Sequence, residues 1–308
     1  MKKALLLATV LLVLKNILFA QNNADSATLY KHITYLCAES SRNFYDTASL
    51  NRVGKYIKQE FQKYNTRVEE MPFEINGKIY KNIVTSYGPE NAPRIIVGAH
   101  YDVCGNQAGA DDNASGIAGL LELSRLLALE SSANMKYRID LVAYTLEEPP
   151  TYGSLDMGSA HHAQYLKEKG IIVYGMICLE MIGYYTDVPH TQSFPADFLK
   201  IFYGNTGNFI TIVRKIHTTT FTRQFTRKFK NQNLIRTQVF RGPTWVQGID
   251  FSDHRNFWNF NWDALMITDT AFYRNKNYHK STDIPDTLNY IKIASVVNSL
   301  YKAILAIT

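Results

Sequence analysis

The stretch Arg94-Ile95-Ile96-Val97-Gly98-Ala99-His100-Tyr101-Asp102 indicates the fold of this 308-residue chain more clearly than any other segment. It starts as a short apolar run, which is typical of a buried strand, and it ends in polar side chains. Residues 109–116 (GADDNASG) then lead into a segment, 115–129, whose apolar residues have the spacing of an amphipathic helix. A strand, a loop and a helix in this order predict one unit of an α/β sheet.

The same alternation continues on both sides of this stretch. Residues 71–86 alternate in polarity around Asn76-Gly77, which is a strong signal for a β-hairpin. Further strands are expected at 139–144, 171–181 and 264–268, and helices at 29–37, 50–64, 154–169 and 287–307. Strands that alternate with helices favour an α/β fold with three layers, α/β/α, in which helices cover both faces of a mostly parallel mixed sheet.

The first twenty residues have the composition of a secretory signal peptide. Lys2 and Lys3 give a positive start, 4–19 is largely apolar, and Ala20 ends the segment with a small residue. Lys15 interrupts the apolar run well short of the roughly 20 residues that a membrane span needs. We therefore expect cleavage after residue 20 and export to the periplasm or the medium, with no stable membrane span; a retained anchor is the alternative. Residues 21–308 contain no repeat and no Pro/Ser-rich linker, and we expect them to form a single catalytic domain.

Charge and cysteine content exclude several classes of protein. The net charge is +6, and no nucleic-acid-binding motif accompanies it, so we expect no nucleic-acid partner. Eight Lys and Arg residues and no Asp or Glu lie between 205 and 249, which indicates either a solvated face or a surface that attracts anions. Cys37, Cys104 and Cys178 leave one cysteine unpaired in any arrangement, so the chain is not a disulfide scaffold, and their spacing does not select a pair.

Side chains that can bind metal follow the predicted strands. Ligands in open α/β sheets sit beyond the carboxyl ends of the strands, so these side chains are expected to share one rim. Imidazole and carboxylate groups are the ligands of catalytic zinc, and two neighbouring metal ions need a carboxylate that bridges them. The candidate residues are His100, Asp112, Glu147, Glu148, Glu180 and His279.

Five short motifs in this order resemble those of the co-catalytic di-zinc aminopeptidases, a family in the superfamily that also contains glutamate carboxypeptidases, transferrin-receptor ectodomains and glutaminyl cyclases. The matching motifs are AHYD (99–102), GADDNASG (109–116), EE (147–148), LEMIGY (179–184) and YHKSTD (278–283). They extend over about 95–290, which is most of the chain. The resemblance implies a zinc-dependent exopeptidase, and in particular an aminopeptidase that hydrolyses N-terminal residues of peptides.

The resemblance also implies two zinc ions per chain and a set of ligands for them. Asp112 would bridge both ions. His100 and Glu180 would complete one site, and Glu148 and His279 the other. Glu180 stands where most relatives carry Asp, and its longer side chain still offers a carboxylate oxygen to zinc.

Three further roles follow from the same resemblance. Glu147 would be the general base that takes a proton from the water activated by zinc and passes it to the leaving amine. Tyr278 would stabilise the oxyanion. Asp102 would orient the imidazole of His100 by accepting its other ring N–H, as carboxylates next to metal ligands commonly do.

Two other functions remain as alternatives at this point. A glutaminyl-peptide cyclase on the same fold would use one zinc ion, whereas the complete GADDNASG motif together with His100 and Glu180 favours two. A binding module with a dead site is the other alternative, although every ligand position holds a competent residue. Asp253 could either cap a short helix or line the pocket, and Asp283 could support His279 or start the final turn.

Overall fold

The computed structural model describes residues 22–39, 41–217 and 219–308. The predicted signal peptide, residues 1–20, therefore lies outside the described residues. Within the described part, no helix combines the length and the apolar character that crossing a membrane requires. The three cysteines are free in the structure, so no disulfide joins them.

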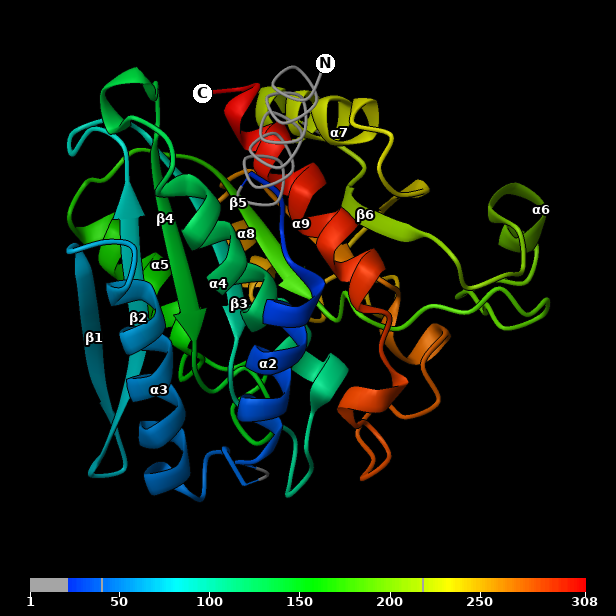
Figure 1. Ribbon diagram of the computed structural model, residues 1–308, viewed down its shortest axis with the longest axis horizontal. Coiled ribbons are helices and arrows are strands. Elements are labelled where there is room, and N and C mark those ends of the chain that lie inside the picture. Colours follow the sequence, from blue (N-terminus) through cyan, green and yellow to red (C-terminus); the bar gives the residue numbers. More distant parts are fainter. Residues whose placement is uncertain (1–21, 40, 218) are drawn as a thin grey trace, which may run out of the picture.

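An eight-stranded mixed sheet forms the centre of the described chain (Figure 1). Across the sheet the order is β1-β2-β4-β3-β5-β8-β6-β7. The four central strands β4, β3, β5 and β8 are parallel, whereas β2 is antiparallel to β4 and β6 is antiparallel to β8. The strands are β1 (Val68–Ile75), β2 (Lys78–Tyr87), β3 (Arg94–His100), β4 (Arg138–Tyr144), β5 (Val173–Glu180), β6 (Ile210–Lys215), β7 (Thr237–Gly242) and β8 (Ala264–Thr268).

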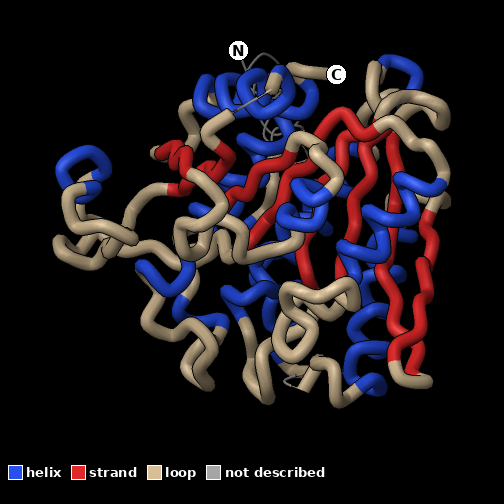
Figure 2. The backbone as a smooth tube through the Cα atoms, turned by 180° about the vertical axis from the view of Figure 1, so that it is seen from behind, coloured by secondary structure: helices blue, strands red, loops and turns tan. Residues whose placement is uncertain are grey.

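Helices cover both faces of this sheet, as the views from the front and from behind show (Figures 1 and 2). One face is covered by α2, α3, α4, α7 and α9, and the other by α5 and α8. The bounds of the helices are α2 (Ser26–Cys37), α3 (Thr47–Gln62), α4 (Gly116–Leu127), α5 (Gly158–Glu168), α6 (Leu199–Tyr203), α7 (Thr220–Asn231), α8 (His254–Asn259) and α9 (Tyr290–Leu305). The predicted three-layer α/β/α architecture with a mixed sheet is confirmed.

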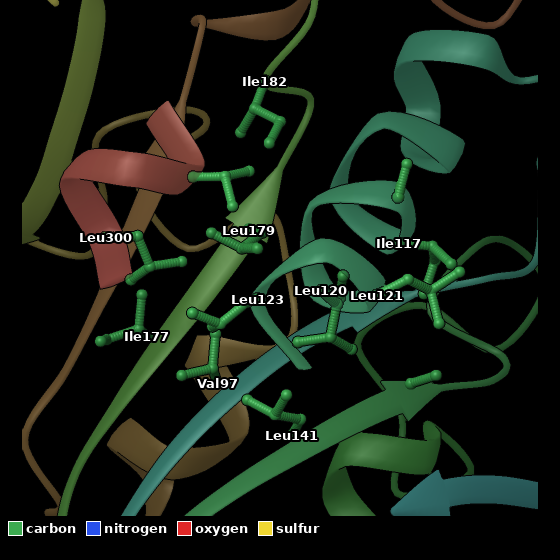
Figure 3. Packing of buried hydrophobic residues seen from close by; sticks show 14 of the residues in the cluster. Val97, Ile117, Leu120, Leu121, Leu123, Leu141, Ile177, Leu179, Ile182 and Leu300 are labelled. Atoms are coloured by element: carbon green, nitrogen blue, oxygen red, sulfur yellow. The ribbon is translucent and has the colours of Figure 1, made fainter. Parts of the chain in front are cut away.

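The apolar runs of the central strands reflect burial on both sides of the sheet. Val97 of β3 faces α4 and packs in the larger core, whereas its neighbour Ile96 faces the smaller core under α5 and α8. Figure 3 shows Val97, Leu141 and Ile177 from three strands close to Leu120 and other side chains of α4. Because both faces are buried, these strands read as continuous apolar segments and show no alternation.

The predicted hairpin and the predicted central elements are present, with ends shifted by a few residues. Asn76 and Gly77 connect β1 to β2 with positive φ angles of 51° and 75°, as a tight hairpin turn requires. The region 205–249, for which the sequence predicts no regular structure, contains β6, α7 and β7. The edge strand β7 and its neighbour β6 are six residues long and half-polar, so their apolar pattern is too weak to identify them.

The contact between β5 and α7 generates a test of the packing. A Cβ on Gly175 of β5 would lie 2.0 Å from the ring of Phe221, which is a buried side chain of α7. Gly175→Ala is therefore expected to lower the free energy of unfolding by about 1–3 kcal/mol, measured by urea denaturation. Gly54→Ala, inside helix α3, is the matched control. A Cβ there would lie 3.6 Å from its nearest neighbour, the hydroxyl of Tyr101, so we expect the free energy of unfolding to rise by up to about 1 kcal/mol. Equal stability of the two variants would contradict this description of the packing.

Candidate metal centre

The six candidate residues lie together at the rim formed by the carboxyl ends of the central strands. His100 is the last residue of β3, and Glu180 is the last residue of β5. Glu147 and Glu148 follow β4, and Asp112 lies in the turn η1 (Ala110–Ser115) that leads into α4. His279 comes from the loop after β8. The sheet topology thus brings residues separated by up to 179 positions to one place.

The carboxylate of Asp112 stands at the centre of this group. Its Oδ1 is 3.4 Å from Nε2 of His100, and its Oδ2 is 3.1 Å from Nε2 of His279. Glu180 Oε2 lies 3.3 Å from the same His100 nitrogen, and Glu148 Oε2 lies 3.3 Å from the same His279 nitrogen. Each oxygen of Asp112 therefore lies close to one imidazole, and each imidazole lies close to one glutamate.

Several atoms of this group are buried and have no hydrogen-bond partner among the described residues. They are Nε2 of His100, Nε2 of His279 and Oε1 of Glu148. Unsatisfied buried polar atoms are costly, so a group of them that converges on one point is typical of a binding site for an ion. His100, Asp112 and Glu148 each present a ligand atom within 4.8 Å of the others, which suits a divalent cation.

The electrostatics of the site also favour a positive charge. Burial and, after it, the nearby carboxylate of Asp112 together raise the pKa of Glu148 to about 7. Burial by itself lowers the pKa of His279, but Asp112 and Glu148 outweigh it and bring the pKa to about 10. Carboxylates this close repel one another unless a cation lies between them.

Glu147 lies at the edge of this group, beside His100. Its Oε2 is 3.9 Å from Nε2 of His100, and only 6% of the residue is exposed. Burial raises the pKa of Glu147 well above its usual range, and the charges of Glu148 and Glu180 act in the same direction. A carboxyl group with a raised pKa can both accept and release a proton near neutral pH.

Asp102 holds the glutamate pair through the backbone. Its two carboxylate oxygens accept hydrogen bonds from the amides of Glu147 and Glu148, at 3.1 and 3.0 Å. Nδ1 of His100 lies 3.2 Å from the backbone carbonyl of Asp102 and 3.6 Å from its carboxylate. The hydrogen bond of His100 is thus accepted by the backbone carbonyl of Asp102, whereas the carboxylate of Asp102 anchors the Glu147–Glu148 segment, a role that no sequence pattern indicates.

Asp283 does the same for the turn that carries Asp112. Its oxygens accept hydrogen bonds from the amides of Asp111 and Asp112 at 3.0 and 3.1 Å, so its carboxylate supports the turn that carries the central ligand. The buried guanidinium of Arg42 fixes the start of the same turn, because it donates to the carbonyls of Ala108 and Gly109. Nothing in the sequence around Arg42 indicates this role.

The side chains of Ser252 and Asp253, at the start of α8, do not cap this helix. Neither side chain accepts a hydrogen bond from the amides of α8. Instead, Oγ of Ser252 donates to Glu180 Oε2 at 2.6 Å and orients that carboxylate. Both oxygens of Asp253 are buried without a hydrogen-bond partner in the described chain, and burial raises its pKa to about 7.

The backbone next to the candidate ligands adopts sparsely populated conformations. Leu146, Met181 and His279 have φ angles of 61°, 47° and 55°, in the left-handed region that non-glycine residues seldom adopt. Leu146 precedes the glutamate pair and Met181 follows Glu180. Such conformations persist where surrounding contacts hold them, and they are common at functional sites.

Comparison with known proteins gives the class that this fold and site define. Residues 82–304 match the model of Peptidase family M28, so the chain belongs to this family of zinc exopeptidases, as its motifs predict. The uncharacterized protein YfbL of Escherichia coli K12 is 42% identical over 287 residues, which cover 90% of this chain and 87% of the relative. Aminopeptidase YwaD of Bacillus subtilis is 32% identical over 156 residues, which cover 48% of this chain and 32% of its own length.

Solved structures share the fold at low sequence identity. LapB of Legionella pneumophila superposes with a TM-score of 0.72 at 22% identity, over 92% of this chain and 72% of its own. An aminopeptidase of Aneurinibacillus has a TM-score of 0.70 at 14% identity, over 92% and 94% of the two chains. The glutaminyl cyclase of Porphyromonas gingivalis has a TM-score of 0.66 at 17% identity, over 92% and 99%. The fold is therefore common to peptidases and cyclases.

The contact of Asp283 with the metal turn can be tested by metal affinity. Asp283→Asn puts an NH₂ group opposite one of the two amides of 111–112, so the turn loses an acceptor. We expect zinc affinity, measured by competition with a chelating dye, to fall by about 10–100-fold, as is usual when residues that orient ligands are changed. Asp286→Asn, an exposed change three residues further on, should leave the affinity as it is. Unchanged affinity in Asp283→Asn would show that the turn does not need this support.

Proposed function

We propose that this chain is a zinc-dependent aminopeptidase that removes N-terminal residues from peptides. Membership of Peptidase family M28 supports a peptidase that uses zinc. The similarity to an aminopeptidase of Bacillus subtilis supports action at the amino end. The sequence of residues 1–20 supports export before the enzyme acts.

The observation that carries this proposal is the division of the site by Asp112. One oxygen of its carboxylate lies close to His100, which is also close to Glu180, and the other lies close to His279, which is also close to Glu148. This arrangement supports two zinc ions per chain, with Asp112 as the shared ligand. When bound, the two ions would supply the Lewis acidity that attack of water on a peptide carbonyl requires.

Proton transfer and stabilisation of the oxyanion are assigned to side chains that bind no metal. Glu147 takes the proton of the attacking water and delivers it to the leaving amine, which its burial and raised pKa favour. Tyr278 stacks on the ring of His279, with the ring centroids 3.8 Å apart, and lines the pocket beside the site. From there its hydroxyl is proposed to stabilise the oxyanion that develops on the substrate carbonyl.

A large pocket next to Glu180 and Tyr278 is the proposed place for the first side chain of the substrate. It encloses about 770 Å³, including space open to solvent. Its walls are mainly aromatic: Phe194, Tyr203, Phe209, Phe240, Phe251, Phe272 and Tyr273. The only charged residue among the described ones that line it is Glu180, which we assign to the metal. A pocket with this lining suits a large neutral side chain.

Substrate preference tests this assignment of the pocket. Phenylalanyl and leucyl amides are expected to have kcat/KM values at least about a hundredfold above those of aspartyl and lysyl amides, because an unpaired charge in an apolar pocket costs several kcal/mol. Kinetics on a panel of aminoacyl amides measures this ratio. A charged first residue that is cleaved as fast as phenylalanine would contradict the proposed pocket.

The role of Glu147 is tested by comparison with its neighbour. Glu147→Gln is expected to keep both zinc ions and to lose at least about a hundredfold in kcat, the usual effect of removing a proton shuttle. Glu148→Gln is the matched variant, and it should lower the zinc content as well as the activity, because it changes a proposed ligand. Metal analysis and kinetics on both variants give the answer. A near-normal kcat in Glu147→Gln would overturn the assignment of the base.

A glutaminyl-peptide cyclase with one zinc ion is the alternative reading of the same fold, since solved cyclases superpose on most of the chain. A cyclase would hold its single zinc ion between Asp112, Glu148 and His279, and the other site would bind no metal. Nε2 of His100 lies close both to the other oxygen of Asp112 and to Glu180, and this second set of ligand atoms supports the two-zinc peptidase instead. The same five competent side chains argue against a binding module without activity.

A further inference from the structure

A groove lined by basic side chains lies at the β6–β7 edge of the sheet, and the proposed hydrolysis makes no use of it. Its basic residues, which we call the arginine groove, are Arg214 of β6, Arg223, Arg227 and Lys230 of α7, and Arg241 of β7. Thr226 and Val239 complete its lining. The arginine groove thus contains five of the eight basic residues in the stretch 205–249, which has no Asp or Glu.

The secondary structure brings these charges together. Arg214 and Arg241 are directly opposite each other in the parallel pair β6–β7, so their side chains point to the same face of the sheet. Helix α7 lies on this face, because Phe221 and Phe225 of α7 share the core with Ile212, two residues before Arg214. Residues 223, 227 and 230 are spaced four and three apart and so lie on one side of the helix.

Acidic groups do not neutralise the arginine groove within the described residues. None of its five basic side chains forms an ion pair there with Asp or Glu. The acid whose charge acts on Arg214 is Asp263, and its Oδ2 already accepts a hydrogen bond from the amide of Thr222. Four exposed like charges and one buried one thus face the same space.

The buried member, Arg214, is the feature that a solvated face does not explain. Only 6% of the residue is exposed, and its Nε has no hydrogen-bond partner among the described residues. Its Nη1 donates to the Thr222 carbonyl at 3.2 Å. Burial, followed by the charge of Arg241, lowers its pKa. A buried guanidinium with a free N–H is costly unless an anion completes its hydrogen bonds.

The arginine groove is separate from the metal centre. Because β6 is antiparallel to β8, its carboxyl end and the start of α7 lie at the rim opposite the one where β3 and β5 end. In Figure 1, α7 lies at the top, whereas the arrowheads of β4 and β5 point down. A ligand in the groove would therefore leave the residues of the metal centre untouched.

We propose that the arginine groove binds the phosphate group of an anionic ligand. Guanidinium groups match the oxygens of phosphate in pairs, and several of them around one space are typical of phosphate recognition. The phosphate can belong to a small soluble molecule or to a lipid headgroup, because both present the same oxygens to the groove. The two sources differ in the probe that reveals them.

The experiment uses the mature chain with its zinc and two probes at constant ionic strength. Inorganic phosphate is titrated calorimetrically, and vesicles of phosphatidylglycerol with phosphatidylcholine are compared with pure phosphatidylcholine by sedimentation. The test variant is Arg223→Gln/Arg227→Gln, which changes two exposed residues of α7. The control is Lys31→Gln/Lys55→Gln, which removes two exposed charges from α2 and α3. Thermal unfolding without the probe checks that each variant is folded.

We expect at least one probe to bind, and the arginine variant to bind it at least about tenfold more weakly than the wild type and the lysine control, since charge-assisted hydrogen bonds are lost. Phosphate binding identifies a soluble ligand, and binding to anionic vesicles alone identifies a headgroup. The proposal would be overturned if neither probe binds, or if the lysine control weakens binding as much as the arginine variant does. It would also be overturned if the arginine variant binds as well as the wild type, which is the result expected when phosphate binds to the zinc ions and not to the groove. Turnover of aminoacyl amides should be the same in all variants, which separates this proposal from that of the peptidase.

Discussion

Repulsion among buried carboxylates is the constraint on which the rest of this structure depends. Asp112, Glu147, Glu148 and Glu180 lie together at the rim of the sheet with little exposure to water. Such a group is stable only if positive charge or hydrogen-bond donors offset the cost of burial. Backbone amides and two imidazoles provide part of this compensation, and the proposed zinc ions provide the remainder. The strained backbone and the supporting carboxylates serve to hold these charges in place.

The central part of the fold could be predicted because its signals are local. The apolar run before His100 and the helix after Gly116 lie within one short stretch, and the motifs at 147–148 and 278–283 follow other predicted elements. Those patterns placed the six candidate residues on one rim, and the structure brings their side chains together. The position at or just after a strand end thus indicates His100, Glu180 and the glutamate pair, whereas Asp112 lies in the turn η1 and His279 in a loop, and both were identified by the resemblance of their motifs.

The supporting contacts could not be predicted because they join residues that are distant in the sequence. Arg42 reaches carbonyls at 108 and 109, and Ser252 reaches Glu180 across 72 residues. A single arginine or serine in a loop has no pattern that reveals such a partner. The strands β6 and β7 were missed for a different reason: their short, half-polar segments obtain stability from pairing within the sheet, and local propensity contributes little. Helix α7 does have a local signal, because Phe221, Phe225 and Phe229 recur every four residues on its buried face, and this spacing could have predicted it.

The central claim is that Asp112 is shared by two metal ions, and diffraction at the zinc absorption edge tests it most directly. Crystals of the chain loaded with zinc should show two anomalous peaks, roughly 3.5–4 Å apart, on either side of that carboxylate. One peak would be next to His100 and Glu180, and the other next to Glu148 and His279. A single peak, held by Asp112, Glu148 and His279 alone at saturating zinc, would contradict the account and favour the one-zinc cyclase.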